Sequence, residues 1–146
     1  ALSGLIVGAN TTITDSTSVL SRFDRPSNKL LSREVTLTGQ SDRVVNLVLG
    51  YEAGPWSARV ASNSKSRYLL QTGSDVVDVS QDAWVDGQKQ IDLSVKYQIN
   101  KSTLLSFEGL NLNKEKYYVY LGNQKYNVQN EQYGRTFRIS LTMTQF

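Results

Sequence analysis

The 146-residue sequence contains neither cysteine nor histidine. Without thiols the chain can form no disulfide and no thiolate zinc site, and without imidazole it has no Ser-His-Asp or Cys-His catalytic group of its own. Any metal site would have to be built from carboxylates alone. These absences exclude several common hydrolytic and metal-dependent chemistries, although they say little about the compartment in which the protein works.

Long hydrophobic runs are also missing. No stretch approaches the roughly 18 apolar residues of a membrane helix, and the chain does not open with the charged and then apolar segments of a signal peptide. Its 16 Lys and Arg stand against 13 Asp and Glu without any long basic run, so we expect no nucleic-acid partner. The apolar content of 39% lies below the roughly 45 to 50% of globular proteins. Such a deficit is normal for a transmembrane barrel, in which half of each strand faces a watery lumen.

What the chain does contain is alternation of apolar and polar residues. A period of two indicates strands whose two faces differ. It predicts six strands, at residues 5–14, 43–52, 56–64, 89–99, 103–112 and 137–143. The fifth loses its alternation near Gly109, where we expect a bulge. No long amphipathic helix is predicted, so the fold class is all-β.

Connections between the predicted strands alternate between long and short. Residues 52–55 and 100–102 predict tight turns because they contain Gly-Pro and Asn-Lys-Ser. The polar stretches 15–42, 65–88 and 113–132 are much longer, and loops of about 20 residues are uncommon inside compact domains. An antiparallel up-and-down meander with every long connection at one end is typical of an outer-membrane barrel, which has long outer loops and short periplasmic turns.

Aromatic residues gather near the ends of the predicted strands. Three lie beside the short turns (Tyr51, Trp56 and Tyr97), and four lie near the opposite ends (Tyr68, Tyr117, Tyr118 and Tyr133). Two belts of amphipathic rings around an aliphatic band would place these residues at both headgroup levels of a membrane. The alternative is that tyrosines simply favour strand ends and binding loops.

Four stretches of the sequence stand out in combination. They are Ser3-Gly4-Leu5 through Asn10 before a Thr-Asp-Ser, Gly50-Tyr51-Glu52-Ala53-Gly54-Pro55-Trp56-Ser57-Ala58-Arg59, Leu105-Ser106-Phe107-Glu108-Gly109-Leu110-Asn111-Leu112, and Tyr133-Gly134-Arg135-Thr136-Phe137. In this order they resemble the C-terminal portion of TonB-dependent receptors, the outer-membrane active transporters of Gram-negative bacteria. The similarity covers essentially the whole chain.

The resemblance implies a 22-stranded barrel with an N-terminal plug inside it, of which residues 1–146 would be the last six strands. The plug and the earlier strands would lie outside this sequence, and TonB would be contacted only through the plug. The implied function is energised uptake of a scarce nutrient, such as an iron chelate, cobalamin or a saccharide, across the bacterial outer membrane. No enzymatic activity and no cofactor are expected, and the implied partners are the remainder of the receptor, outer-membrane lipid and the barrel assembly machinery.

Two alternatives remain open. One is a soluble all-β module that binds a ligand such as a carbohydrate, with its apolar rows packed inside a sheet folded on itself. The other is a small autonomous outer-membrane barrel. It would have to oligomerise, because the smallest closed barrels have about eight strands.

The terminal strand carries candidate recognition residues. In the resembling family this strand is a signal for the barrel assembly machinery, which implies that role for Phe137, Ile139, Leu141, Met143 and Phe146. Phe146 is one position out of phase with the other four, because it is even-numbered and they are odd-numbered.

Loop and lumen residues supply the remaining candidates. The loop tyrosines that would stack on a glycan or aromatic ligand are Tyr117, Tyr118, Tyr120 and Tyr126. The charges on the polar rows are Arg59, Asp92, Lys96, Glu108 and Arg138. We expect them to form a solvated wall with cross-strand ion pairs, the alternative being contact with plug or ligand. The acidic stretch with Asp75, Asp78, Asp82 and Asp86 is expected to be a solvated loop, with a calcium site as the alternative.

Overall fold

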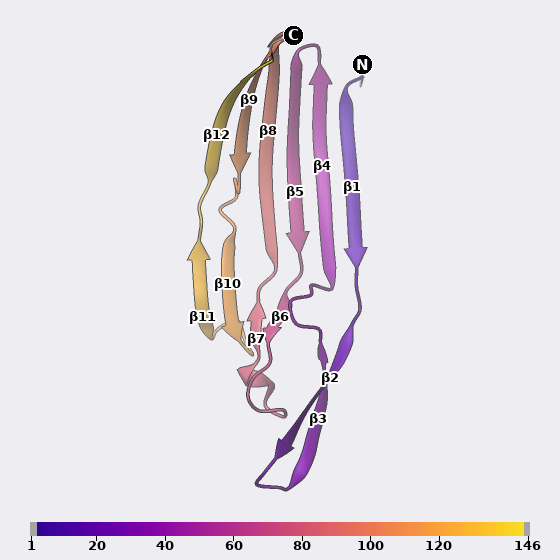
Figure 1. Ribbon diagram of the computed structural model, residues 1–146, viewed down its shortest axis with the longest axis vertical. Coiled ribbons are helices and arrows are strands. Elements are labelled where there is room, and N and C mark those ends of the chain that lie inside the picture. The colour runs from indigo at the N-terminus through magenta and orange to yellow at the C-terminus, as the bar shows by residue number, and fades with distance from the viewer. Residues whose placement is uncertain (1–2, 145–146) are drawn as a thin grey trace.

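The computed structural model describes residues 3–144, which form antiparallel β-sheets. The largest is a six-stranded sheet whose strands follow chain order (Figure 1). Its strands are β1 (Leu5–Ile13), β4 (Arg43–Ala53), β5 (Trp56–Lys65), β8 (Gln88–Asn100), β9 (Thr103–Leu110) and β12 (Thr136–Met143). The six predicted strands are therefore confirmed, with small differences at their ends. In the described chain, no helix is long and apolar enough to cross a membrane.

The register of these strands brings the predicted apolar rows together. Val60 of β5 lies opposite Leu49 of β4 and Leu93 of β8, and Phe107 of β9 lies opposite Ile139 of β12. We call this surface the apolar face. It comprises the odd-numbered positions of β1, β4, β8, β9 and β12 and the even-numbered positions of β5. The other positions form the polar face.

The two ends of the six-stranded sheet differ. Short turns at Gly54-Pro55 and Lys101-Ser102 lie at one end, which we call the turn end (Figure 1). Gly54 has a φ of 55°, the positive value that a type II′ hairpin needs at its first central residue. At the other turn, Asn100 Oδ1 accepts a hydrogen bond from the Ser102 N–H at 3.0 Å. The three long connections lie at the opposite, loop end, which confirms the predicted arrangement of long and short connections.

The long connections are not loops alone, because each of them contains strands that the alternation did not predict. The first forms a projecting hairpin of β2 (Thr17–Asp24) and β3 (Lys29–Thr36) (Figure 1). The second carries β6 (Tyr68–Gln71), a short 3-10 helix η1 (Val79–Gln81) and β7 (Ala83–Val85), and the third carries β10 (Lys116–Leu121) and β11 (Asn127–Gln132). The last four strands pair in the order β11-β10-β7-β6, and we call them the loop sheet.

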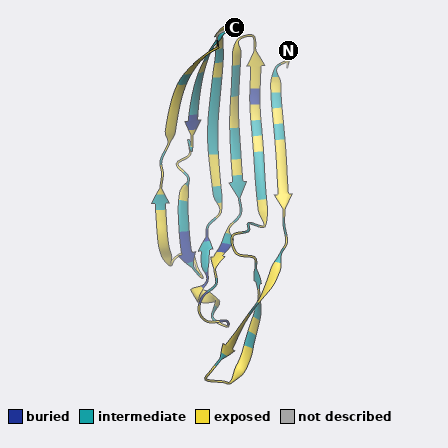
Figure 2. Ribbon diagram, viewed as in Figure 1, coloured by how far each residue is buried: buried dark blue, intermediate teal, exposed yellow. Residues whose placement is uncertain are grey.

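The best-buried apolar side chains lie in and beside the loop sheet, not in the larger sheet (Figure 2). They are Leu69, Val76, Val85, Val119 and Tyr120. On the apolar face, by contrast, Leu49 is 56% exposed and Ile139 is 74% exposed. The chain exposes 10358 Å², whereas a compact monomer of 16.3 kDa would expose about 7,500 Å². The larger sheet is therefore a single layer without a core of its own.

The bulge predicted at Gly109 does not occur. Gly109 pairs regularly with Leu93 of β8, and the alternation stops beyond it because β9 ends at Leu110. The irregularity in the pairing of β8 with β9 lies at the turn end instead, between Gln98 and Asn100. The loss of alternation near Gly109 therefore reflects the end of β9 and not a residue inserted into the strand.

Beyond β9, the side chain of Asn113 continues the hydrogen bonding to β8. Its Oδ1 accepts from the Ile91 N–H at 3.0 Å and its Nδ2 donates to the Lys89 carbonyl. The Leu112 N–H donates to the Ile91 carbonyl at 2.8 Å. The amide therefore takes the place of a peptide group and satisfies two backbone groups that β9 no longer reaches.

Replacing Asn113 with alanine is expected to lower the free energy of unfolding by about 1 to 2 kcal/mol, because two hydrogen bonds of roughly 1 kcal/mol each are lost. Urea unfolding of the detergent-folded chain, followed by circular dichroism, measures the change. Asn130→Ala is the matched control, since Asn130 is exposed and makes no side-chain hydrogen bond within residues 3–144. Equal losses in the two variants would contradict a stabilising role for the Asn113 amide.

Candidate functional site

The polar face of the six-stranded sheet is hollowed. The hollow measures about 750 Å³ and is lined mainly by polar-face residues of β4, β5, β8 and β9. Its charged side chains are Glu52, Arg59, Asp92, Lys96 and Glu108. Because successive side chains of a strand point to opposite faces, each strand contributes its polar row to the hollow and leaves its apolar row on the other side.

Two cross-strand ion pairs lie on this face. They confirm the expected pairing for Arg59, Glu108 and Arg138, and the partner of Arg59 is Glu52, which was not among the predicted charges. Arg59 Nη2 lies 2.9 Å from Glu52 Oε1, and Arg138 Nη1 lies 3.5 Å from Glu108 Oε2. All four side chains are well exposed, so each pair is worth about 1 kcal/mol or less. Lys96 has no ion-pair partner among the described residues.

Asp92, the remaining charge predicted for the polar face, binds the backbone just beyond the end of β9. Asp92 Oδ1 accepts from the Asn111 N–H at 2.8 Å. Asn111 has a φ of 54°, its Nδ2 donates to the Gly134 carbonyl at 2.8 Å, and its Oδ1 accepts from the Glu115 N–H at 2.6 Å. Asparagine suits this position because it tolerates the left-handed region and its amide both donates and accepts. The Leu-Asn-Leu element therefore joins β8, β9 and the approach to β12.

A second hollow, of about 470 Å³, lies where the polar face meets the loop sheet. Asn63 and Gln90 contribute amides to it, and Tyr117 and Tyr133 contribute rings. Burial, followed by the neighbouring Tyr68, raises the pKa of the Tyr117 phenol. The combination provides hydrogen-bonding groups and aromatic surface at the loop end of the polar face.

The other loop tyrosines predicted to contact a ligand lie apart from this hollow. Tyr118 donates its hydroxyl hydrogen to the Gln124 carbonyl at 2.7 Å, and Tyr126 is 69% exposed. Tyr120 is only 1% exposed and packs in the core of the loop sheet. Its ring therefore offers no open face for stacking, because both faces of β10 are covered at this point and the neighbouring Val119 is buried as well.

Aromatic residues of the apolar face form a belt at the turn end. Trp56 lies opposite Tyr97, with ring centroids 4.4 Å apart. Tyr51 lies on the same face and is 48% exposed. This placement agrees with the belt predicted beside the short turns.

The second belt, predicted at the loop end, is wrong. Tyr68, Tyr117 and Tyr118 belong to strands of the loop sheet, and Tyr133 lines the hollow of the polar side. None of these four residues therefore lies on a strand of the six-stranded sheet.

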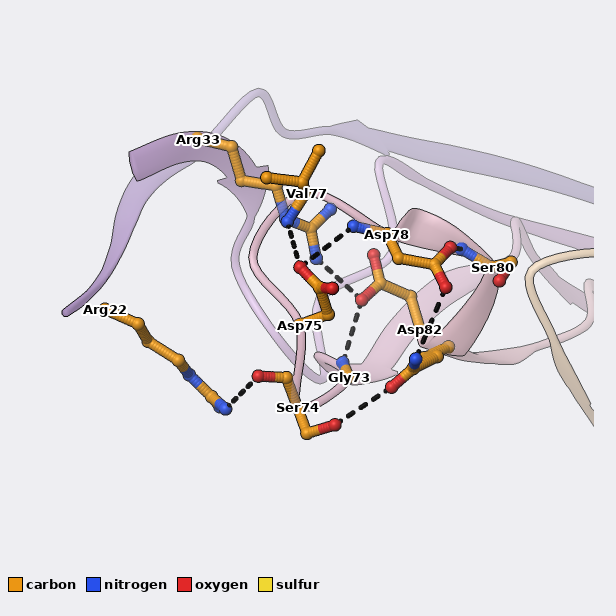
Figure 3. A network of polar contacts seen from close by, with 10 residues as sticks. Arg22, Arg33, Gly73, Ser74, Asp75, Val77, Asp78, Ser80 and Asp82 are labelled. Carbon is orange, nitrogen blue, oxygen red and sulfur yellow. Dashed lines mark hydrogen bonds and ion pairs between the residues drawn. The ribbon is translucent and has the colours of Figure 1, made fainter. Parts of the chain in front are cut away.

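The acidic stretch is not a solvated loop throughout, because Asp82 is buried. Its side chain is 3% exposed, and its Oδ1 lies 2.6 Å from Arg33 Nη2 and accepts from the Gly73 N–H at 2.9 Å (Figure 3). The hydrogen bond to Asp82 raises the pKa of Arg33 above its ordinary value. Arg22 Nη1 donates to the Ser74 carbonyl at 2.6 Å in the same region. These contacts join the β2–β3 hairpin to the second connection.

Other carboxylates of this stretch bind the backbone of their own loop. Asp75 Oδ1 accepts from the Val77 N–H at 2.7 Å, and Asp78 Oδ1 accepts from the Ser80 N–H at 2.9 Å. The hydrogen bonds from Ser80 lower the pKa of the Asp78 carboxyl. Within residues 3–144, no group of three or more His, Cys, Asp or Glu side chains is placed to hold a metal ion. The calcium alternative therefore finds no site in the described chain.

The candidate assembly residues lie on the apolar face of β12. The exposed fractions are 59% for Phe137, 74% for Ile139, 53% for Leu141 and 70% for Met143. In the six-stranded sheet β12 pairs only with β9, so its outer edge is open within the described chain. Phe146, the fifth candidate, lies outside the described residues.

The described chain thus presents an exposed apolar face, a hollowed polar face and two open sheet edges. Charged side chains of the polar face form ion pairs with one another. At the loop end, the amides of Asn63 and Gln90 line a hollow together with Tyr117 and Tyr133. Comparison of the chain with protein-family models, with curated proteins and with solved structures found no match.

Proposed function

We propose that this chain is a wall segment of a transmembrane β-barrel in the bacterial outer membrane, and specifically the C-terminal barrel segment of a TonB-dependent receptor. In that role it contributes wall, outer loops and an assembly strand to energised uptake of a scarce nutrient. It performs no covalent chemistry. The remainder of the receptor, comprising the plug and the other strands, is its main partner.

The apolar face is the observation that carries the proposal. It crosses all six strands in register, and its large apolar side chains range from half-buried to well exposed. Contiguous exposed apolar patches larger than about a few hundred Å² are rare on water-soluble monomers. The row from Ile91 to Ile99 spans about 27 Å at about 3.4 Å per residue, close to the roughly 25 Å apolar band of outer-membrane barrels. An apolar band of this height would contact the acyl chains of membrane lipids.

The polar face and the sheet edges support the same proposal. Charged side chains such as Arg59 and Glu108 line the hollow and suit a watery lumen, since the same charges are costly against lipid. β1 and β12 each leave one edge unpaired within the described chain. Open edges are not tolerated in lipid, because unpaired backbone groups cost several kcal/mol each. Further strands from the rest of the receptor would close them.

The purified chain is expected to stay soluble only with detergent or lipid, because the apolar face has no protein cover. Sedimentation with and without a mild detergent, combined with thermal unfolding, tests this. A monomer that unfolds cooperatively in detergent-free buffer would overturn the proposal and favour the soluble binding module. Leakage of a dye from liposomes caused by this chain alone would instead favour the small autonomous barrel.

A further inference from the structure

Two cations stand at the loop end of the apolar face. Arg43 is the first residue of β4 and precedes Val45 and Leu47 in the apolar row. Lys89 lies near the start of β8 and precedes Ile91 in the apolar row of that strand. Both side chains are exposed. They therefore mark the loop-end border of the apolar face on strands separated only by β5, with Lys89 level with Val45 and Arg43 two positions nearer the loop end.

A hollow of about 310 Å³ lies between these cations. Serines of β5 form its floor, because Ser64 pairs with Val45 on one side and with Lys89 on the other. Ser62, the next residue of that row, pairs with Leu47. The hollow thus has a cationic rim, a hydroxyl floor and an apolar upper wall.

Four polar side chains of this hollow are free to bind a ligand, namely those of Arg43, Lys89, Ser62 and Ser64. The hollow is also lined by Ser66, whose hydroxyl accepts from the Arg43 N–H, and by Lys65, whose ammonium lies over the Tyr68 ring. Neither Arg43 nor Lys89 has an ion-pair partner in residues 3–144. The hydroxyl groups of Ser62 and Ser64 make none of the side-chain hydrogen bonds found in that part of the chain. Two unpaired cations beside two unused hydroxyls form a donor set suited to a phosphate, whose oxygens accept charge-assisted hydrogen bonds.

We propose that this hollow binds the phosphate-bearing headgroup of a membrane lipid in the leaflet on the loop side, an inference that rests on the proposed membrane position of the sheet. The hollow opens directly onto Val45 and Leu47, so a lipid whose phosphate meets Arg43 and Lys89 lays its acyl chains along the apolar face. A soluble phosphate would leave that apolar wall in water. The amphiphilic surroundings therefore favour a lipid over a free anion.

The opposite border of the apolar face has a different chemistry. Near the turn end its rows carry Tyr51, Trp56, Tyr97 and Met143. No Lys or Arg occupies an apolar-face position of the six strands at that end of the described chain. Cations attract anionic lipid within about a Debye length, whereas aromatic rings suit any headgroup region. The turn itself carries the exposed Lys101, but the combination of two cations and two free hydroxyls is found at the loop-end border of the described apolar face.

The test uses the full chain folded in a zwitterionic detergent, with bound lipid counted by native mass spectrometry. The probes are phosphatidic acid, phosphatidylcholine with the same acyl chains, and inorganic phosphate. The chain is expected to bind phosphatidic acid about tenfold more tightly than phosphatidylcholine. The double variant Arg43→Gln, Lys89→Gln should lose that preference, while Arg59→Gln, Lys96→Gln on the polar face should keep it.

Equal binding of the two lipids by the folded chain would overturn the inference, and so would an unchanged preference in the Arg43 and Lys89 variant. Displacement of phosphatidic acid by millimolar inorganic phosphate would assign the hollow to a soluble anion instead. Each of these outcomes leaves the proposed function standing, provided that the chain still needs detergent. A chain that is monomeric and folded without detergent would overturn both proposals.

Discussion

Substitution of Leu93 by arginine is expected to block assembly of the chain into the membrane. Leu93 lies on the apolar face, opposite Val60 on one side and Gly109 on the other. An arginine on the lipid face near the bilayer midplane costs about 2 to 4 kcal/mol. The yield of protease-resistant, membrane-integrated protein, compared with the unchanged chain, measures the effect.

The same substitution at Ser94 is the matched control. Ser94 is the next residue of β8 but lies on the polar face, opposite Arg59 and Glu108. A new guanidinium there meets water and a carboxylate, so assembly should change little. If the two variants assemble equally well or equally badly, the assignment of the two faces is wrong.

Substitution of Asp82 by asparagine is expected to destabilise the contact between the β2–β3 hairpin and the second long connection by about 3 kcal/mol, the lower end of the cost of leaving one member of a buried ion pair uncompensated. The lower end applies because the Arg33 side chain retains 18% exposure while that of Asp82 has 3%. Hydrogen exchange of the backbone amides of β6, β7 and η1 measures the local loss.

Two comparisons isolate the ion pair from other effects. Asp42→Asn removes an exposed carboxylate that makes no side-chain hydrogen bond or ion pair within residues 3–144, and it should change stability by no more than about 0.5 kcal/mol. The double variant Arg33→Met, Asp82→Leu removes both charges and should recover much of the loss, since a pair replaced by apolar groups leaves no charge unpaired. Equal protection in Asp82→Asn and Asp42→Asn would show that the pair does not hold the hairpin.

The strands of the larger sheet could be predicted because their signal is local. In β8, five apolar residues from Ile91 to Ile99 alternate with polar ones, and one buried or lipid-facing side is enough to impose that period. The two short turns could be predicted from residue types that favour turns. Gly54 adopts a positive φ, and the Asn100 side chain accepts a hydrogen bond from the turn backbone. The same alternation predicted which residues lie on each face of the sheet and that charges of the polar face would form ion pairs.

The loop sheet could not be predicted, because its strands depend on distant partners. Val119 of β10 pairs with Val85 of β7, and Tyr68 of β6 pairs with the same residue. Strands of three to six residues carry too little alternation to stand out from polar surroundings. For the same reason Tyr120 looked like a loop residue although its ring is in the core. Asp82 likewise looked like one of four equivalent loop carboxylates.

The sequence by itself determined the six strands, their order of short and long connections, and which side chains share a face, since each follows from neighbours in the chain. The tertiary structure decided that the apolar face stays uncovered, that the polar face is the hollowed one, and that Arg33 meets Asp82 across 49 positions. Those properties depend on the curvature of the sheet and on contacts between distant segments. No local pattern encodes them, because they arise only when the strands pair.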